Sequence, residues 1–175
     1  MKFALPLLLL LFISSCSAVR VQYDYDNETE FSAYSTYNYY PDMETGLNDL
    51  DNRRLMRAID STMRAKGLLL SEEPDFYVAI VGRSFQAARK NTVGVGLGGS
   101  GRNVGGGLSV GIPVGAAKME REIRFDFVDS QKDELFWQAV TVSAFNDNST
   151  PEIKEEKLRA IVQKAFEKYP PKQRK

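Results

Sequence analysis

The sequence lacks histidine altogether and has a single cysteine, Cys16. Without an imidazole group it cannot form a Ser-His-Asp or Cys-His catalytic arrangement, and it has no histidine with which to bind a metal ion. One thiol cannot form a disulfide within the chain, so a hydrophobic core must stabilise the fold, for which 175 residues are sufficient. We therefore expect no catalytic residues, no metal site, no cofactor and no enzymatic activity.

The chain also lacks an excess of charge of either sign, because 23 lysines and arginines balance 23 aspartates and glutamates. A protein that binds nucleic acid needs a basic excess or a basic stripe to neutralise phosphates. Nucleic acid is therefore not an expected partner of this protein.

The N-terminal segment has the features of a secretion signal. Lys2 precedes an apolar run over residues 3–13, which is shorter than the roughly 20 residues of a membrane-spanning helix. The sequence Ile13-Ser14-Ser15-Cys16 then resembles the lipobox of bacterial lipoproteins, in which a branched apolar residue and two small residues precede the cysteine that receives diacylglycerol. We expect residues 1–15 to be a lipoprotein signal peptide, Cys16 to be lipidated, and residues 16–175 to form one domain.

The residues after Cys16 bear on where such a lipoprotein is sorted. Ser17 is not the aspartate associated with retention in the inner membrane, and no acidic cluster of the kind associated with surface export follows it. These features favour a protein anchored in the outer membrane of the cell envelope and facing the periplasm.

Periodic patterns of apolar residues indicate the secondary structure. Alternation predicts strands over residues 19–26, 36–40, 76–85, 123–127 and 135–145, and helical spacing predicts amphipathic helices over residues 50–66 and 151–169. On the first helix, the charged residues are expected on the solvent side, namely Arg53, Arg54, Arg57, Asp60 and Arg64. The order of elements predicts an α+β two-layer sandwich, with a mainly antiparallel sheet of five or more strands and both helices packed on one face.

A glycine-rich segment interrupts this pattern, since ten of the 13 glycines lie within residues 94–115. Gly94, Gly96 and Gly99 match the spacing of a dinucleotide-binding loop, but no helix pattern follows to receive a pyrophosphate. Two readings stay open: a hairpin that contacts a partner, and an insertion without one. The hairpin would present alternating apolar residues, namely Val93, Val95, Leu97, Leu108, Val110 and Ile112.

Two further groups of residues could carry chemistry. Asp126, Asp129, Asp133 and Glu134 cluster around a predicted hairpin turn, where they are either solvated turn residues or a carboxylate pair for glycoside hydrolysis. Six of the eight tyrosines lie within residues 23–40. Tyrosine is a common strand residue, although exposed rings could also stack on sugars.

Several segments of the chain share a pattern with known sequences. They are Val21-Gln22-Tyr23-Asp24-Tyr25-Asp26, residues 31–37 with the following Pro41, Lys66-Gly67 before Pro74-Asp75-Phe76, the glycine-rich middle, and Phe136-Trp137-Gln138-Ala139. Together they resemble a family of small bacterial lipoproteins classed as a domain of unknown function, number 4136 in that series. Ala139 departs from the glycine expected after the tryptophan. The resemblance implies an α+β lipoprotein domain and supplies no activity or site residues.

These observations lead to one expected function and two alternatives. We expect a lipid-anchored envelope lipoprotein that binds or scaffolds another envelope component, either a protein or peptidoglycan, without catalysing a reaction. The first alternative is a carboxylate-dependent hydrolase of envelope glycan. The second is a carrier of lipid or another small ligand, which would need an apolar cavity between the helices and the sheet.

Overall fold

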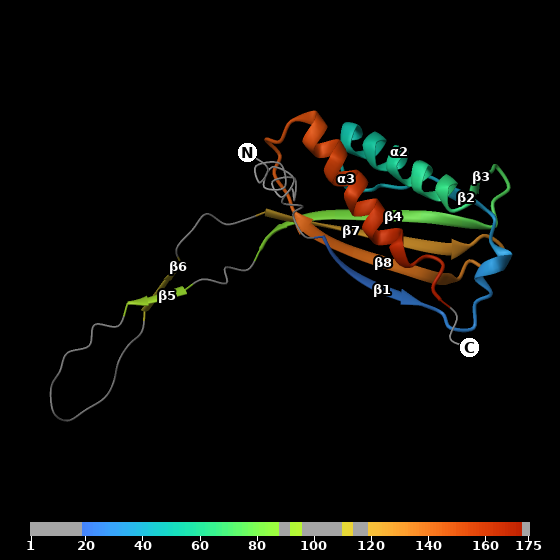
Figure 1. Cartoon of the computed structure of the whole chain (residues 1–175), viewed down its shortest axis with the longest axis horizontal. Coiled ribbons are helices and arrows are strands. Elements are labelled where there is room, and N and C mark those ends of the chain that lie inside the picture. Colours follow the sequence, from blue (N-terminus) through green and yellow to red (C-terminus); the bar gives the residue numbers. More distant parts are fainter. Residues whose placement is uncertain (1–18, 88–91, 96–109, 114–118, 173–175) are drawn as a thin grey trace, which may run out of the picture.

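A computed structural model describes residues 19–87, 92–95, 110–113 and 119–172 (Figure 1). The expected signal peptide and Cys16 lie outside the described residues. Within them the chain forms a mixed six-stranded sheet with two helices, which confirms the predicted α+β class. No helix in these ranges is both long enough and apolar enough to cross a bilayer.

The sheet combines antiparallel and parallel pairing. Its strand order is β1 (Arg20–Tyr25), β8 (Leu135–Ala144), β7 (Met119–Asp129), β4 (Phe76–Gln86), β2 (Thr36–Tyr39) and β3 (Leu69–Leu70). The pairs β1–β8, β8–β7 and β7–β4 are antiparallel, whereas β2 pairs parallel with both β4 and β3. A parallel pair requires a crossover connection, and α2 (Asp49–Ala65) supplies it between β2 and β4. The sequence pattern did not indicate these parallel pairs.

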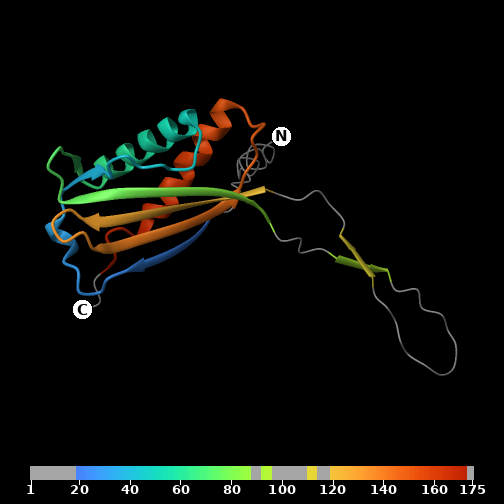
Figure 2. The same ribbon diagram turned by 180° about the vertical axis from the view of Figure 1, so that it is seen from behind.

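Two helices, α2 and α3 (Pro151–Ala165), lie on one face of the sheet and begin at the same end of it (Figures 1 and 2). Their N-termini are capped by Asn48, which accepts a hydrogen bond from the Asp51 N–H, and by Thr150, which accepts one from the Ile153 N–H. The predicted C-terminal helix is shorter than expected, because a 3-10 turn, η3 (Phe166–Lys168), follows α3. Another such turn, η2 (Phe31–Ala33), precedes β2.

Aromatic rings fill the space between the helices and the sheet. Phe127 lies 4.5 Å from Trp137, 5.4 Å from Phe166 and 4.9 Å from Tyr169, measured between ring centroids. A register shift beside Phe127 adds one residue to β8, so that the consecutive residues Phe136 and Trp137 are both buried. This dense packing differs from the apolar cavity that a ligand carrier would need.

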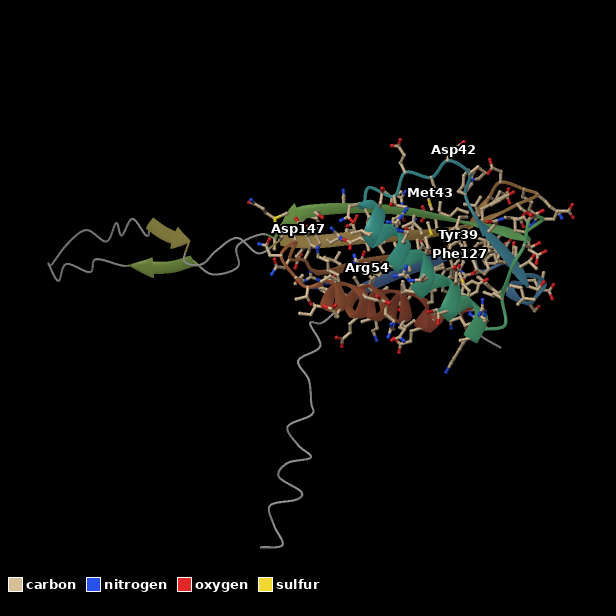
Figure 3. All side chains as sticks on the ribbon, turned by 90° about the horizontal axis from the view of Figure 1, so that it is seen from above. Tyr39, Asp42, Met43, Arg54, Phe127 and Asp147 are labelled. Atoms are coloured by element: carbon tan, nitrogen blue, oxygen red, sulfur yellow. The ribbon has the colours of Figure 1, made fainter. Side chains whose placement is uncertain are left out.

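The loop after β2 lies beside β4, with Asp42 and Met43 on its path (Figure 3). Gly46 adopts φ +70° and approaches Gly82 so closely that a Cβ atom there would lie 2.4 Å from the Gly82 carbonyl oxygen. The Gly82 N–H donates a 2.7 Å hydrogen bond to the Thr45 carbonyl oxygen. Contact between the two glycine backbones therefore fixes the path of the chain into α2.

Part of the glycine-rich region is described as a separate two-stranded sheet. β5 (Thr92–Val95) pairs antiparallel with β6 (Val110–Pro113), and Val93 is opposite Ile112 while Val95 is opposite Val110. Leu97 and Leu108 lie outside the described residues. The role of this segment in partner contact stays a prediction.

Candidate functional site

The four clustered carboxylates of the predicted hairpin do not converge on one point. Asp126 accepts a hydrogen bond from Gln138 and pairs with Arg124 on the sheet face opposite the helices. Asp133 accepts one from the Tyr40 hydroxyl. Asp129 and Glu134 do line a common recess, which we call the acidic recess; its other carboxylates are Asp26, Glu28, Glu30 and Asp75.

Two carboxylates of the acidic recess serve as hydrogen-bond acceptors for the surrounding backbone. Hydrogen bonds from the Ser35 and Thr36 N–H groups outweigh burial and lower the pKa of Asp75. Burial raises the pKa of Asp129, but hydrogen bonds from Lys132, Tyr34 and Gln131 outweigh it and leave the pKa below its usual value. A glycosidase needs one carboxyl group whose pKa is raised so that it stays protonated. Neither aspartate has that property.

The clustered tyrosines are mostly part of the packed structure. The Tyr34 ring stacks on Phe136 with a centroid distance of 4.2 Å. The hydroxyls of Tyr37 and Tyr39 both donate to Oδ1 of Asp60 on α2, over 2.8 and 2.6 Å. These contacts favour the interpretation of these three tyrosines as structural residues over that of a sugar-stacking surface.

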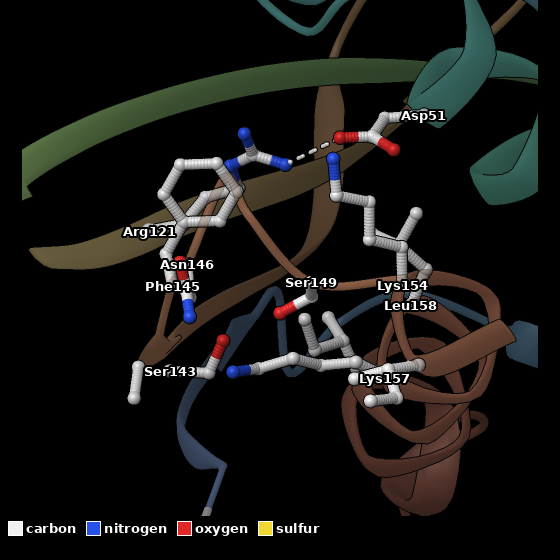
Figure 4. Close-up of a pocket in the computed structure, with 12 residues that line it drawn as sticks. Asp51, Arg121, Ser143, Phe145, Asn146, Ser149, Lys154, Lys157 and Leu158 are labelled. Atoms are coloured by element: carbon white, nitrogen blue, oxygen red, sulfur yellow. Dashed lines mark hydrogen bonds and ion pairs between the residues drawn. The ribbon is translucent and has the colours of Figure 1, made fainter. Parts of the chain in front are cut away.

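A second site, which the sequence did not suggest, lies at the opposite end of the sheet, where β7 begins and β8 ends. Figure 4 shows it in close-up. We call it the basic cleft; it is small and partly open to solvent. The end of β8, the start of β7 and the first turns of both helices bring its walls together. Its polar lining residues are Asp51, Arg121, Ser143, Asn146, Ser149, Lys154 and Lys157.

An almost fully buried carboxylate organises one wall of the basic cleft. Asp51 is 1% exposed and accepts hydrogen bonds from Arg54 and Arg121, over 2.9 and 3.1 Å. Burial raises the pKa of Asp51, but the two guanidinium groups outweigh this effect and lower it overall. The predicted solvent position of Arg54 is wrong, because its side chain is only 13% exposed and turns toward Asp51.

Three contacts fix the side chain of Arg121. Besides its bond to Asp51, its Nε donates to the Ser84 hydroxyl over 3.3 Å. Its guanidinium carbon lies 3.5 Å from the centre of the Phe145 ring, which is a cation–π contact. The guanidinium group is therefore fixed in place at the edge of the cleft.

The two lysines of the basic cleft are held less firmly, although the charge of Lys154 helps to lower the pKa of Asp51. Neither Lys154 nor Lys157 forms a hydrogen bond or ion pair with the described residues. Burial, reinforced by the positive charge of Arg121, lowers the pKa of Lys157. Ser143 is 3% exposed and lines the same cleft as Lys157 (Figure 4). In the sequence, only the three-residue spacing of the two lysines hinted at a shared helix face.

The described residues hold no group of three or more acidic, histidine or cysteine side chains arranged to bind a metal ion.

The fold that carries the two sites is that of a small α+β domain. The model of a family described as a domain of unknown function, DUF4136, matches residues 21–171, and the chain belongs to this family. The resemblance noted in the sequence is therefore confirmed at the level of the family.

Solved structures extend the comparison at the level of the fold. A PDZ domain protein from Parabacteroides distasonis ATCC 8503 is similar with a TM-score of 0.61 and 11% sequence identity. The match covers 90% of this chain and 37% of that protein, so the chain spans little more than a third of its length. At this identity the likeness concerns the fold alone.

Two structures of a PelC dodecamer from Paraburkholderia phytofirmans, one of them of a variant with a leucine replaced by methionine, are more distant. Their TM-scores are 0.46 and 0.44 (the latter for the variant), with 9% and 8% identity. The matches cover 85% and 83% of this chain and 96% and 95% of theirs. These TM-scores are too low to support a structural argument. No curated protein matches the sequence.

Proposed function

We propose that the protein is a lipid-anchored lipoprotein of the bacterial cell envelope, whose single domain binds or scaffolds another envelope component without catalysing a reaction. In this proposal the domain is a two-layer sandwich, and residues 94–115 form a glycine-rich hairpin. The anchor is Cys16 after removal of residues 1–15, and the protein faces the periplasm from the outer membrane.

The observation that carries this proposal is the short distance along the chain between Cys16 and the first strand. β1 begins at Arg20 and pairs at once with Val142 of β8. Four residues span about 14 Å when fully extended. A lipid on Cys16 would therefore hold this end of the sheet close to the bilayer surface, and a tether of this length restricts the orientation of the domain.

A binding role agrees better with the side chains than a catalytic one. The chain has no histidine, and Cys16 is assigned to the lipid. Asp75 and Asp129 in the acidic recess have lowered pKa values, so each is a poor general acid. A glycan hydrolase has one point in its favour, the shared recess of Asp129 and Glu134. Release of soluble fragments from purified peptidoglycan, abolished by Asp129→Asn, would establish that alternative.

Two features offer a partner a place to bind. Within the described residues, β1 is an edge strand that pairs with β8 on one side, so its other side presents backbone groups for strand addition. The glycine-rich segment offers the alternating apolar residues Val93, Val95, Leu97, Leu108, Val110 and Ile112. An envelope protein or peptidoglycan is the proposed partner.

The anchor is tested by expressing the full chain in a Gram-negative host and measuring the intact mass and membrane partition of the product. We expect a mature protein that begins at Cys16, carries acyl chains and fractionates with the outer membrane. Cys16→Ser should accumulate with residues 1–15 attached, whereas the neighbouring Ser17→Ala should be processed normally. A soluble wild-type protein that retains residues 1–15 would disprove the proposal.

The binding role is tested by crosslinking in the native envelope followed by mass spectrometry. Deletion of residues 94–115 should preserve cooperative unfolding and abolish the crosslinks made through the hairpin. If the deletion variant does not fold, the segment belongs to the core instead.

A further inference from the structure

The basic cleft contains more positive charge than its own carboxylate can neutralise. Arg121, Lys154 and Lys157 line it, while Asp51 is its one acidic lining residue and is already shared between Arg121 and Arg54. Lys154 and Lys157 are half-buried, and partial burial of a cation without a hydrogen-bonded counter-ion is unfavourable. The arrangement is therefore one that a bound anion would complete.

Hydrogen-bond donors point into the same space. Ser143, near the end of β8, and Asn146 and Ser149, in the loop that follows, line the cleft (Figure 4). An acceptor placed beside the Ser143 hydroxyl would gain a hydrogen bond. Cationic and hydroxyl donors around one point are the groups that bind phosphate oxygens.

The basic cleft opens at the end of the domain that the proposed anchor would hold near the membrane. Ser143 follows Val142, the residue that pairs with Arg20 at the start of β1. Leu50 and Ile153, in the first turns of α2 and α3, are 56% and 53% exposed. Ile153 lines the basic cleft, and Leu50 lines a shallow recess at the same end of the helices. Exposed apolar side chains next to basic ones are typical of surfaces that contact anionic bilayers.

Among the described residues at this end of the domain, most charges outside the cleft are balanced. Asp49 and Glu152 occupy the first turns of the two helices, where they offset the helix dipoles. Arg20 and Arg83 pair with Glu120 and Glu122 on β7. Binding of a single phosphate group therefore accounts for the arrangement better than a diffuse attraction to a charged surface.

We propose that the basic cleft binds the phosphate of an anionic phospholipid headgroup in the membrane to which the protein is tethered. This inference rests on the proposed lipid anchor. The phosphate oxygens would accept hydrogen bonds from Lys157, Ser143 and Arg121. Occupation of the cleft would orient the domain with this end toward the bilayer and the acidic recess, at the other end of the sheet, away from the anionic surface.

The test is lysine acetylation of the mature protein in uncharged dodecyl maltoside micelles, followed by mass spectrometry. Phosphatidylglycerol is added to the micelles in one arm, phosphatidylcholine in a second, and inorganic phosphate to the buffer in a third. We expect phosphatidylglycerol to slow acetylation of Lys154 and Lys157 by about fivefold or more once it exceeds four times its dissociation constant. Lys132, at the opposite end of the sheet, is the internal control and should react at an unchanged rate.

Matched variants separate specific binding from general charge effects. Lys157→Gln should abolish the protection of Lys154, whereas Lys132→Gln should leave it intact. Ser143→Ala should weaken the protection without removing a charge. Equal slowing of Lys132, protection by inorganic phosphate but not by phosphatidylglycerol, equal protection by phosphatidylcholine, or no protection would each overturn the proposal.

The two proposals fail in different ways. The intact mass of the same sample reports whether Cys16 carries acyl chains, and the acetylation pattern reports on the cleft. If the protein is unlipidated but its lysines are protected, the anchor is disproved and the phosphate site stands. If the protein is lipidated but its lysines are not protected, the anchor stands and the phosphate site is disproved.

Discussion

Asp51 on α2 and Arg121 on β7 form a hydrogen-bonded ion pair of 3.1 Å, although 70 residues separate them in the sequence. Their side chains are only 2% and 12% exposed. This pair joins the first turn of a helix to the sheet beneath it, and it determines the shape of the basic cleft. The stability of the domain and the geometry of the cleft therefore depend on the same carboxylate.

Replacing Asp51 by asparagine should destabilise the domain by about 2–4 kcal/mol, because Arg54 and Arg121 would lose their shared counter-ion in a mostly buried position. Urea unfolding followed by circular dichroism measures the change. Asp49→Asn is the matched control, since Asp49 lies two residues away on the same helix and is exposed. Its loss should remove only a helix-dipole interaction of less than about 1 kcal/mol. Similar losses for both variants would contradict the structure.

The domain should become less stable in acid. Asp51, Asp75 and Asp129 have folded-state pKa values below their ordinary value of 3.8. Their stabilising contribution is present above about pH 4 and is lost as the pH falls through the lowered values. Urea midpoints measured from pH 6 down to pH 3 should fall at the acid end, and the fall should be smaller in Asp75→Asn. An unchanged midpoint would show that these carboxylates are not selectively stabilised by folding.

The domain should also lose stability above about pH 10. Burial raises the pKa values of Tyr34, Tyr37, Tyr39 and Tyr169, and hydrogen bonds to Asp129 or Asp60 add to this effect in the first three. Because the unfolded tyrosines ionise near 10.0, stability is fully present below that pH and is lost as the pH rises toward the folded-state values. Absorbance of tyrosinate should rise cooperatively with unfolding. A gradual rise from all eight tyrosines at their ordinary pKa would exclude this packing.

Gly46→Ala should destabilise the domain by more than about 2 kcal/mol, because the added methyl group meets the Gly82 carbonyl oxygen and the backbone has a positive φ. Gly67 offers a control that separates the two causes. It has φ +84° at the end of α2, but a Cβ atom there would have no neighbour within 4 Å. Gly67→Ala should therefore cost about 1–2 kcal/mol, the strain of a left-handed conformation alone. Equal effects in thermal unfolding would show that the close approach is unimportant.

Local patterns predicted the helices and most strands because each depends on a short stretch of chain. The helix expected over residues 50–66 is α2, and the strand expected over residues 76–85 is β4, which has a neighbour on each side. Alternation cannot show which strands pair, so the parallel pairing of β2 with β4 was not foreseen. β3 was missed because a strand of two residues has no detectable period.

The basic cleft was beyond sequence reasoning for a related physical reason. Its polar residues come from the start of α2, the start of β7, the end of β8, the loop that follows β8 and the first half of α3, and only the fold brings them together. Asp51 could have been noticed only as an acid in a helix first turn, which normally complements the helix dipole at the surface. Its burial depends on Arg121, for which the sequence gives no sign of proximity.

The last residue of β4, Gln86, pairs with the first residue of β7, Met119. The chain therefore departs from the sheet and rejoins it at adjacent positions in one ladder, whatever lies between them. Doubling the length of such a connection raises the entropic cost of closing it by only about 0.6 kcal/mol. This junction is thus a permissive point for inserting, shortening or exchanging sequence while the remaining strands and helices keep their registers.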